Sequence, residues 1–290
     1  MTWFEVIFLG LVQGLTEFLP VSSSGHLAIF KNIFGLEEAG LTYDILLHLG
    51  TLAAVFICYY KDIWKLICAA CSMLVDFCHN VAVVARNIKN DDDVPLRRVV
   101  NTSYKKFTIL IIVSTIPTGI IGIVFGDLIE LAGTSLLVPG ICLIITGILL
   151  RISDNLDEGY KSPKTTTWKD AGIIGIAQGI ATLPGISRSG TTIFACLACG
   201  LKREYAVKYS FIVSIPAILG AGILDIKDLS SEAVPASEIW MYVVGAVIAG
   251  AVGFVCIKWM LKIVSSRKFK YFSYYCLIIG AISVIAFFFV

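Results

Sequence analysis

The sequence predicts an all-α polytopic membrane protein with six transmembrane helices and two re-entrant helical hairpins, arranged as an inverted-topology repeat. The composition, six apolar segments and a polar motif that occurs twice lead to this prediction. Of the 290 residues, 57% are hydrophobic and 15% are charged, and the mean hydropathy is +0.86. Soluble domains carry roughly 25% charged residues, so this composition indicates one membrane domain over residues 1–290. The formal net charge of +2 is too small to indicate a nucleic-acid partner.

Six apolar segments approach the ~20 residues that an α-helix needs to cross a bilayer. They cover residues 41–60, 107–125, 136–150, 209–224, 239–257 and 271–290. The segment between the first two is mixed, because Lys65, Asp76 and His79 interrupt its apolar patches. We expect this insert, residues 61–106, to form an interfacial or cytoplasmic helix pair rather than a span.

The distribution of basic residues predicts the orientation of the spans. Lys and Arg cluster in residues 61–106, 151–169 and 258–270, whereas the segments 126–134 and 225–238 are acidic and nearly free of them. Cytoplasmic loops of membrane proteins carry the excess of Lys and Arg. We therefore expect the three basic segments on the cytoplasmic side and the two acidic segments outside.

A polar motif rich in glycine and proline occurs twice in the chain. QGLTEFLPVSSSG at residues 13–25 aligns without gaps to QGIATLPGISRSG at residues 178–190, with the glutamine, two glycines and two serines in register. The duplication predicts two repeats, residues 1–150 and residues 171–290, each with the motif followed by three spans. An odd number of spans per repeat inverts the second repeat relative to the first. Interrupted helices of inverted repeats meet near the bilayer midplane, where the binding site lies.

The helix-breaking residues of the motifs predict the two re-entrant hairpins. Pro20 and Pro184 interrupt helices, and non-helical backbone at membrane depth is tolerated only where it is buried in protein or lines a cavity. A charged side chain near the bilayer centre costs at least ~2.5–3.5 kcal/mol. The charged residues Glu17, His26 and Arg188 therefore indicate mutual pairing or a function. One interpretation is purely structural, namely a buried Glu17–Arg188 ion pair that locks the two repeats together.

The serines around these charged residues favour a site that binds oxyanions. Hydroxyl groups and free backbone N–H groups donate to phosphate oxygens, and a guanidinium binds two such oxygens at once. The expected substrate-binding residues share this polar character and are Gln13, Ser22, Ser24, Ser187, Ser189 and Thr192.

A carboxylate beside a phosphate site predicts phosphoryl transfer with a bridging divalent cation. Mg²⁺ is usually held by one or two carboxylates together with substrate phosphates, and Ca²⁺ also prefers oxygen ligands. Glu17, assisted by Gln13, is the expected ligand of Mg²⁺ or Ca²⁺. The expected catalytic residues are Glu17, Ser23 as the attacking hydroxyl, His26 as general acid or base, and Arg188 as the group that stabilises the transferring phosphoryl. The pattern leaves open whether Ser23, His26 or a water molecule attacks.

Both motifs closely resemble the signature motifs of the undecaprenyl-diphosphate phosphatase family, membrane enzymes linked to bacitracin resistance. The resemblance covers nearly the whole chain and includes the SIPA element at residues 214–217. It implies that a polyprenyl diphosphate lipid is the substrate, hydrolysed to undecaprenyl phosphate and inorganic phosphate with a divalent cation. This reaction recycles the lipid carrier for cell-wall synthesis. Where many members carry two glutamates, this chain has Gln13 and a single carboxylate.

The resemblance also implies a location and a set of site residues. The location is the bacterial cytoplasmic (inner) membrane, with the site open to the outer face, and a homodimer is compatible with it. The family's functional positions fall on Gln13, Glu17, Ser22, Ser23, His26, Ser187, Arg188 and, nearby, Thr192.

Two alternative functions use the same kinds of residue. Phosphatidic-acid phosphatases of type 2 place a histidine shortly after their S-R element, but here SGTTIF follows Arg188 and no histidine is present. A polyprenyl-phosphate flippase or transporter could use the same anion site without chemistry. Asp44 and His48, one helical turn apart, either surround the site as a second layer or form a structural pair.

Overall fold

All regular elements are helices in the computed structural model, which describes residues 1–34, 41–228 and 236–289. In chain order they are α1 (Trp3–Phe18), α2 (Ser23–Phe34), α3 (Leu41–Asn90), α4 (Ser103–Val124), α5 (Gly126–Gly133), α6 (Leu137–Asn155), α7 (Trp168–Ile180), α8 (Arg188–Ala198), α9 (Arg203–Asp228), α10 (Ala236–Ser265) and α11 (Phe269–Phe287). Within this range, β-type pairing is limited to an isolated bridge between Lys161 and Leu201. The predicted all-α class is confirmed. Part of the acidic segment predicted to lie outside, residues 229–235, falls outside the described residues.

Six of the described helices are long and apolar enough to cross a membrane, namely α3, α4, α6, α9, α10 and α11. Each overlaps one of the six predicted spans, so the predicted number is confirmed. The helices that carry the two polar motifs are shorter: α1 has 16 residues, α2 has 12, α7 has 13 and α8 has 11.

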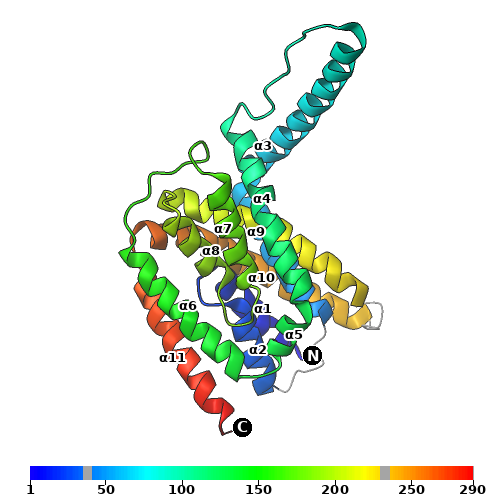
Figure 1. The fold of residues 1–290 in the computed structure, drawn as a ribbon. Coiled ribbons are helices and arrows are strands. Elements are labelled where there is room, and N and C mark those ends of the chain that lie inside the picture. The colour runs from blue at the N-terminus through cyan, green and yellow to red at the C-terminus, as the bar shows by residue number, and fades with distance from the viewer. Residues whose placement is uncertain (35–40, 229–235, 290) are drawn as a thin grey trace.

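The segment that follows the first span differs from the predicted helix pair. The helix α3 continues through Asn90 as a 50-residue element, interrupted only by non-helical backbone at Tyr59 (φ −113°, ψ 20°). Its second part projects from the rest of the molecule, and a non-helical segment returns beside it to α4 (Figure 1). No glycine or proline lies between residues 61 and 90 to end the helix. The prediction of two helices here was therefore wrong.

Side chains of the projecting helix hold the returning segment. Asn80 donates to the Arg97 carbonyl oxygen and accepts from the Arg97 N–H, both at 2.8 Å. Asn87 makes the same paired contacts with Val94, at 3.0 and 3.3 Å. The side-chain amides of Asn80 and Asn87 thus supply hydrogen-bond partners to the backbone of the returning segment, which has no helix or strand to supply them. This is why the return needs no second helix.

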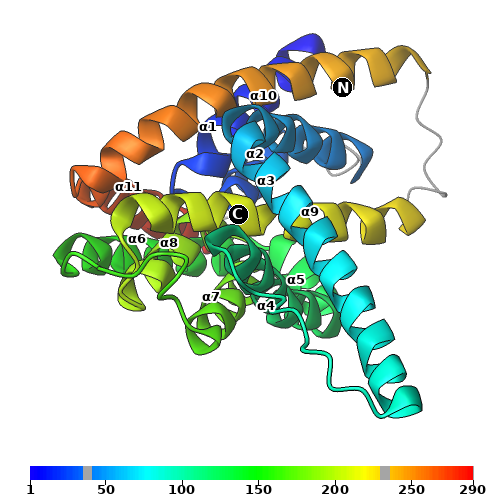
Figure 2. The ribbon, with the colours of Figure 1, turned by 90° about the horizontal axis from the view of Figure 1, so that it is seen from above.

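The short helices of the polar motifs pack against long helices distant in sequence. In Figure 2, α1 lies along α10 and α7 lies beside α4. Small residues permit the close approach: a Cβ at Gly10 would come within 2.7 Å of the Gly245 carbonyl oxygen, and one at Gly175 within 2.1 Å of the Ser114 carbonyl oxygen. The first helix of each motif, α1 or α7, is therefore fixed against the other half of the chain.

The start of α7 is fixed by a capping box and an ion pair. The Thr167 hydroxyl accepts from the Asp170 N–H at 3.1 Å, and the Asp170 carboxylate accepts from the Thr167 N–H at 2.9 Å. Such reciprocal bonds satisfy free donors of the first helical turn. Lys161, in the connection before α7, donates to the same carboxylate at 2.8 Å, and this hydrogen bond raises the pKa of Lys161.

Candidate active site

Each polar motif folds as a helix, a sharp non-helical break and a second helix. After α1, Leu19 is extended (φ −71°, ψ 144°) and Ser22 is in the left-handed region (φ 68°), so the chain turns around Pro20 before α2 begins at Ser23. Between α7 and α8 the left-handed residue is Gly185 (φ 93°). A Cβ at Gly185 would also lie 2.3 Å from the Pro139 carbonyl oxygen, so both the backbone and the space require glycine.

The two breaks lie in direct contact. A Cβ at Gly25 would come within 2.9 Å of Gly185 Cα, and one at Gly190 within 3.1 Å of Pro20 Cβ. From α6, the Thr146 hydroxyl donates to the Gly185 carbonyl oxygen at 3.1 Å and accepts from the Ser187 N–H at 3.0 Å. Residues 165 positions apart in sequence therefore share one buried volume, as the repeated motif predicts.

Glu17 is the centre of the resulting polar cluster. The residue is 5% exposed, and the Arg188 guanidinium donates to its Oε1. Gln13 Nε2 donates to Oε2 at 3.0 Å, and Ser23 Oγ donates to the same oxygen at 2.6 Å. His48 Nε2, on α3, lies 3.9 Å from Oε2. The predicted proximity of Glu17 and Arg188 is confirmed, and so is the ion pair on which the structural interpretation rests.

Ser23 and Arg188 hold equivalent positions in the two motifs. Each is the first residue of the second helix of its pair, α2 or α8, and each donates to the Glu17 carboxylate. The first turn of a helix carries free N–H groups and the positive end of the helix dipole. Two positive helix ends and one guanidinium therefore surround a single carboxylate, and this arrangement favours an additional anion.

The remaining serines of the two motifs bind mostly within the breaks. Ser22 Oγ accepts from the Gly25 N–H at 3.2 Å, and Ser187 Oγ accepts from the Gly190 N–H at 3.1 Å, which are equivalent contacts. Ser24 Oγ lies 3.4 Å from Ser22 Oγ, and Ser189 Oγ lies 3.4 Å from Ser187 Oγ. None of these four serines hydrogen-bonds to Glu17 in the described residues, in contrast to Ser23.

Thr192 is turned toward α9 rather than toward the carboxylate. Its hydroxyl donates to the Arg188 carbonyl oxygen at 2.8 Å and shares a hydrogen bond with the Ser210 hydroxyl. The residue is fully buried. In this arrangement Thr192 stabilises the start of α8, and so the orientation of Arg188.

His26 lies in a separate hydrogen-bonded pair close to the first break. Its Nδ1 lies 2.7 Å from the Ser22 carbonyl oxygen, which can only accept, so Nδ1 carries the proton. Its Nε2 then accepts from the Tyr275 hydroxyl at 2.7 Å, and the two rings stack with their centroids 5.6 Å apart. Sequence analysis missed Tyr275 because it lies 249 positions away in an aromatic stretch of the last span.

Two polar atoms of the cluster are buried without a hydrogen-bond partner among the described residues. They are Gln13 Oε1, an acceptor, and Arg188 Nη1, a donor. A buried unsatisfied polar group costs ~1–3 kcal/mol, so each is suited to a bound ligand. The amide of Gln13 is bonded through Nε2 to the Glu17 carboxylate, and its Oε1 together with that carboxylate offers the kind of oxygen ligand that Mg²⁺ and Ca²⁺ prefer. In the described part of the chain, no three His, Cys, Asp or Glu residues come together to hold a metal, so a cation would need oxygens from the substrate as well.

Together these features define a polytopic helical membrane protein with a charged cluster where two interrupted helix pairs meet. The chain belongs to the family described as bacitracin resistance protein BacA, whose model matches residues 6–282. The protein is therefore an integral membrane protein.

Several relatives of the chain are undecaprenyl-diphosphatases. The chain is 41% identical to the undecaprenyl-diphosphatase of Alkaliphilus metalliredigens (strain QYMF) over 286 residues, and the aligned region covers 98% of each chain. The undecaprenyl-diphosphatase of Methanosphaera stadtmanae is 43% identical over 281 residues, covering 97% of this chain and 96% of the relative. That of Desulfatibacillum aliphaticivorans is 41% identical over 291 residues, covering 99% of both.

Proposed function

We propose that this protein hydrolyses undecaprenyl diphosphate to undecaprenyl phosphate and inorganic phosphate, and so recycles the lipid carrier for cell-wall synthesis. The observation that carries the proposal is the match to undecaprenyl-diphosphatases over nearly the whole of both chains. The Glu17–Arg188 cluster supplies groups suited to this chemistry at the contact of the two motifs. The flippase alternative has no support among these relatives.

Arg188 and the break backbone are proposed to bind the diphosphate. Arg188 Nη1 is buried and has no hydrogen-bond partner among the described residues, and the helices α2 and α8 begin at the cluster. A guanidinium together with helix N-termini is a common arrangement for phosphate oxygens. The same groups would stabilise the negative charge of the transferring phosphoryl. Ser22, Ser24, Ser187 and Ser189 line the breaks beside these groups.

Ser23 is the proposed attacking group. Its hydroxyl donates to Glu17 at 2.6 Å, whereas both ring nitrogens of His26 are engaged by Ser22 and Tyr275. In the first step, Glu17 takes the Ser23 proton as the Oγ–phosphorus bond forms. The bond from the terminal phosphorus to the bridging oxygen breaks, and undecaprenyl phosphate leaves with the electron pair.

The second step restores the enzyme. A water molecule attacks the phosphorus of phosphorylated Ser23, and the Oγ–phosphorus bond breaks. Ser23 regains its proton from Glu17. The proton of the water passes to the Tyr275 hydroxyl as that hydroxyl gives its own proton to His26 Nε2, which later returns it to solvent. The Tyr275 hydroxyl, which donates to Nε2 here, orients the ring for this transfer.

A divalent cation, Mg²⁺ or Ca²⁺, is proposed at Glu17 and Gln13 Oε1. When bound together with substrate oxygens, it would neutralise part of the diphosphate charge. Gln13 Oε1, an amide oxygen without a partner in the described residues, supports this assignment. With Gln13 in place of a second glutamate, one carboxylate suffices if the substrate completes the coordination.

The membrane arrangement proposed is an inverted repeat of residues 1–150 and 171–290, with α1–α2 and α7–α8 as re-entrant hairpins. Its support is the matched packing: α1 meets α10 through Gly10 and Gly245, while the equivalent α7 meets α4 through Gly175 and Ser114. We place the site on the outer face of the bacterial cytoplasmic membrane, with the basic segments inside.

A homodimer is proposed through the projecting part of α3, with a second copy of this chain as the partner. An apolar heptad seam, typical of coiled coils, faces outward there. Its eight positions, all exposed, are Trp64, Ile67, Cys71, Leu74, Cys78, Val81, Ala85 and Ile88.

Cysteine cross-linking tests this dimer. In a parallel pair, Cys71 would meet Cys71 of the second copy, so mild oxidation in membranes should give a disulfide-linked dimer. Replacement of Cys71 and Cys78 by serine should abolish it, whereas a monomer at all oxidant levels would contradict the pairing.

The test of the function is phosphate release from undecaprenyl diphosphate in detergent, where no membrane is available for transport. We expect release by the purified protein, loss of release with a chelator, and recovery with added Mg²⁺ or Ca²⁺. Glu17→Gln should lower the rate at least ~10²-fold. Glu130→Gln, an exposed carboxylate on α5, is the matched control and should not change it. Lipid binding without phosphate release would reject the proposal.

A further inference from the structure

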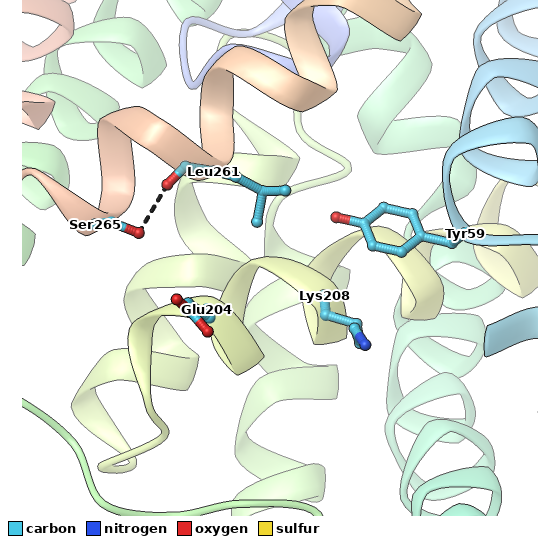
Figure 3. Close-up of a pocket in the computed structure, with 5 residues that line it drawn as sticks. All are labelled: Tyr59, Glu204, Lys208, Leu261 and Ser265. Atoms are coloured by element: carbon cyan, nitrogen blue, oxygen red, sulfur yellow. Dashed lines mark hydrogen bonds between the residues drawn. The ribbon is translucent and has the colours of Figure 1, made fainter. Parts of the chain in front are cut away.

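A cavity of about 270 Å³ lies between α3, α9 and α10, and its residues take no part in the cluster around Glu17. It is lined by Tyr59, Glu204, Lys208, Leu261 and Ser265 (Figure 3). A second cavity, of about 190 Å³, shares Glu204 and Ser265 with the first. The two cavities therefore adjoin at the start of α9 and the end of α10.

Tyr59 places an unsatisfied hydroxyl in the larger cavity. Its side chain is 7% exposed, and its hydroxyl has no hydrogen-bond partner among the described residues. Figure 3 shows this hydroxyl directed into the space near Leu261. The helix α3 is non-helical at this residue, so the break in α3 sets the direction of the ring. A buried donor without a partner is costly, which indicates a ligand with an acceptor atom.

Arg203 provides a second unsatisfied donor, in the adjoining cavity. The residue is 3% exposed, and its Nη2 donates to the Leu156 carbonyl oxygen at 2.9 Å. Its Nε lies 3.4 Å from Glu158 Oε2, while Nη1 has no partner in the described part of the chain. Arg203 is also the first residue of the 26-residue helix α9, where the helix dipole favours anions.

The charges around the cavities favour a phosphate group over a neutral ligand. Lys208 lines the larger cavity and donates to Asp62 at 3.0 Å, and Lys202 lines the smaller one. The two cavities together are lined by three cationic side chains, those of Lys202, Arg203 and Lys208, and by two carboxylates, those of Glu158 and Glu204. The excess of cations and the Tyr59 hydroxyl suit the oxygens of a phosphate. Glu204, exposed where the cavities meet, is suited to a positively charged or donating group next to that phosphate.

From these observations we infer that the paired cavities bind a phosphate group, carried by a membrane phospholipid headgroup or by free phosphate. The Leu261 side chain and the Tyr59 ring give the larger cavity an apolar wall, as an acyl chain would need. Since Lys208 and Arg203 both belong to α9, the bound phosphate would bridge this helix to α3 at Tyr59. The site is separate from the cluster in which Glu17 and Arg188 lie.

Native mass spectrometry of the full-length protein, stripped of lipid in detergent, tests the inference. The probes are phosphatidylethanolamine, phosphatidylglycerol, diacylglycerol and inorganic phosphate. We expect retention of the two phospholipids but not of diacylglycerol, and about 5-fold weaker retention in Tyr59→Phe and Lys208→Met. The matched controls Tyr60→Phe and Lys262→Met, exposed positions outside the cavities, should retain lipid like the wild type.

Competition between bound phospholipid and inorganic phosphate distinguishes a lipid headgroup from free phosphate as the ligand. Displacement of lipid by inorganic phosphate identifies free phosphate as a ligand of the same site, and failure to displace identifies the headgroup. Equal retention of diacylglycerol, or unchanged retention in both cavity variants, would overturn the inference. Loss of retention in Arg188→Gln alone would also overturn it, because the lipid would then occupy the other cluster. Melting curves without lipid show that each variant folds, and only the lipid-induced rise in melting temperature should be smaller in Tyr59→Phe.

Discussion

The Glu17–Arg188 pair can be both a structural lock and part of the catalytic site, and a double-variant cycle separates the two roles. Glu17 is 5% exposed and the Arg188 side chain is 19% exposed. Removal of one partner of a buried ion pair typically costs ~3–5 kcal/mol, because the other charge stays buried and unpaired. For Glu17→Gln and for Arg188→Gln, we therefore expect melting temperatures lower by on the order of 10 °C.

The double variant Glu17→Gln/Arg188→Gln removes both charges together. A neutral pair of similar volume is often tolerated in place of a buried ion pair, so most of the lost stability should return. Activity should not return, because the proposed base and the phosphate-binding group are both missing, and the rate should stay at least ~10²-fold below wild type. The assays are thermal unfolding in detergent and phosphate release from undecaprenyl diphosphate. Full activity in the double variant would show that the pair is only structural and would refute our reasoning.

Three further predictions follow from the same geometry. Ser23→Ala should lower the phosphate-release rate at least ~10²-fold. Ser24 bonds to Ser22 rather than to Glu17, so Ser24→Ala should change the rate less than ~10-fold, and equal effects would exclude Ser23 as the attacking group. Tyr275→Phe should slow turnover by about 10-fold and leave the melting temperature nearly unchanged, since the ring stacking remains; a rate equal to wild type would remove the tyrosine from the mechanism. Gly175→Ala should destabilise the fold by ~2 kcal/mol or more, because the new Cβ would lie 2.1 Å from the Ser114 carbonyl oxygen. Gly172→Ala is the control, since a Cβ there meets open space. Similar melting temperatures of the two variants would contradict the packing of α7 on α4.

The six spans were predictable because apolar length is a local property of the sequence. The contact of the two motifs was also predictable, since the repeat relates residues 165 positions apart. Two features were not. The single helix through Asn90 depends on the side chains of Asn80 and Asn87, which hold the return segment without a second helix. The partner of His26, Tyr275, comes from the last span and has no sequence signal of its own.

The ion pair also explains how the proposed anion site can hold a buried guanidinium before substrate arrives. An isolated buried Arg188 would be costly. Glu17 offsets its charge and leaves Nη1 without a partner in the described part of the chain. Glu17 in turn is held by Gln13 and Ser23, so the carboxylate stays oriented beside the hydroxyl that it is proposed to deprotonate. An incoming diphosphate would compete with Glu17 for the guanidinium and weaken its hold on Oε1. Oε1 would then be available to the proposed cation, while Oε2, which already accepts from the Ser23 hydroxyl, would stay in place to take its proton. Substrate binding would thus free one carboxylate oxygen without separating the base from the nucleophile.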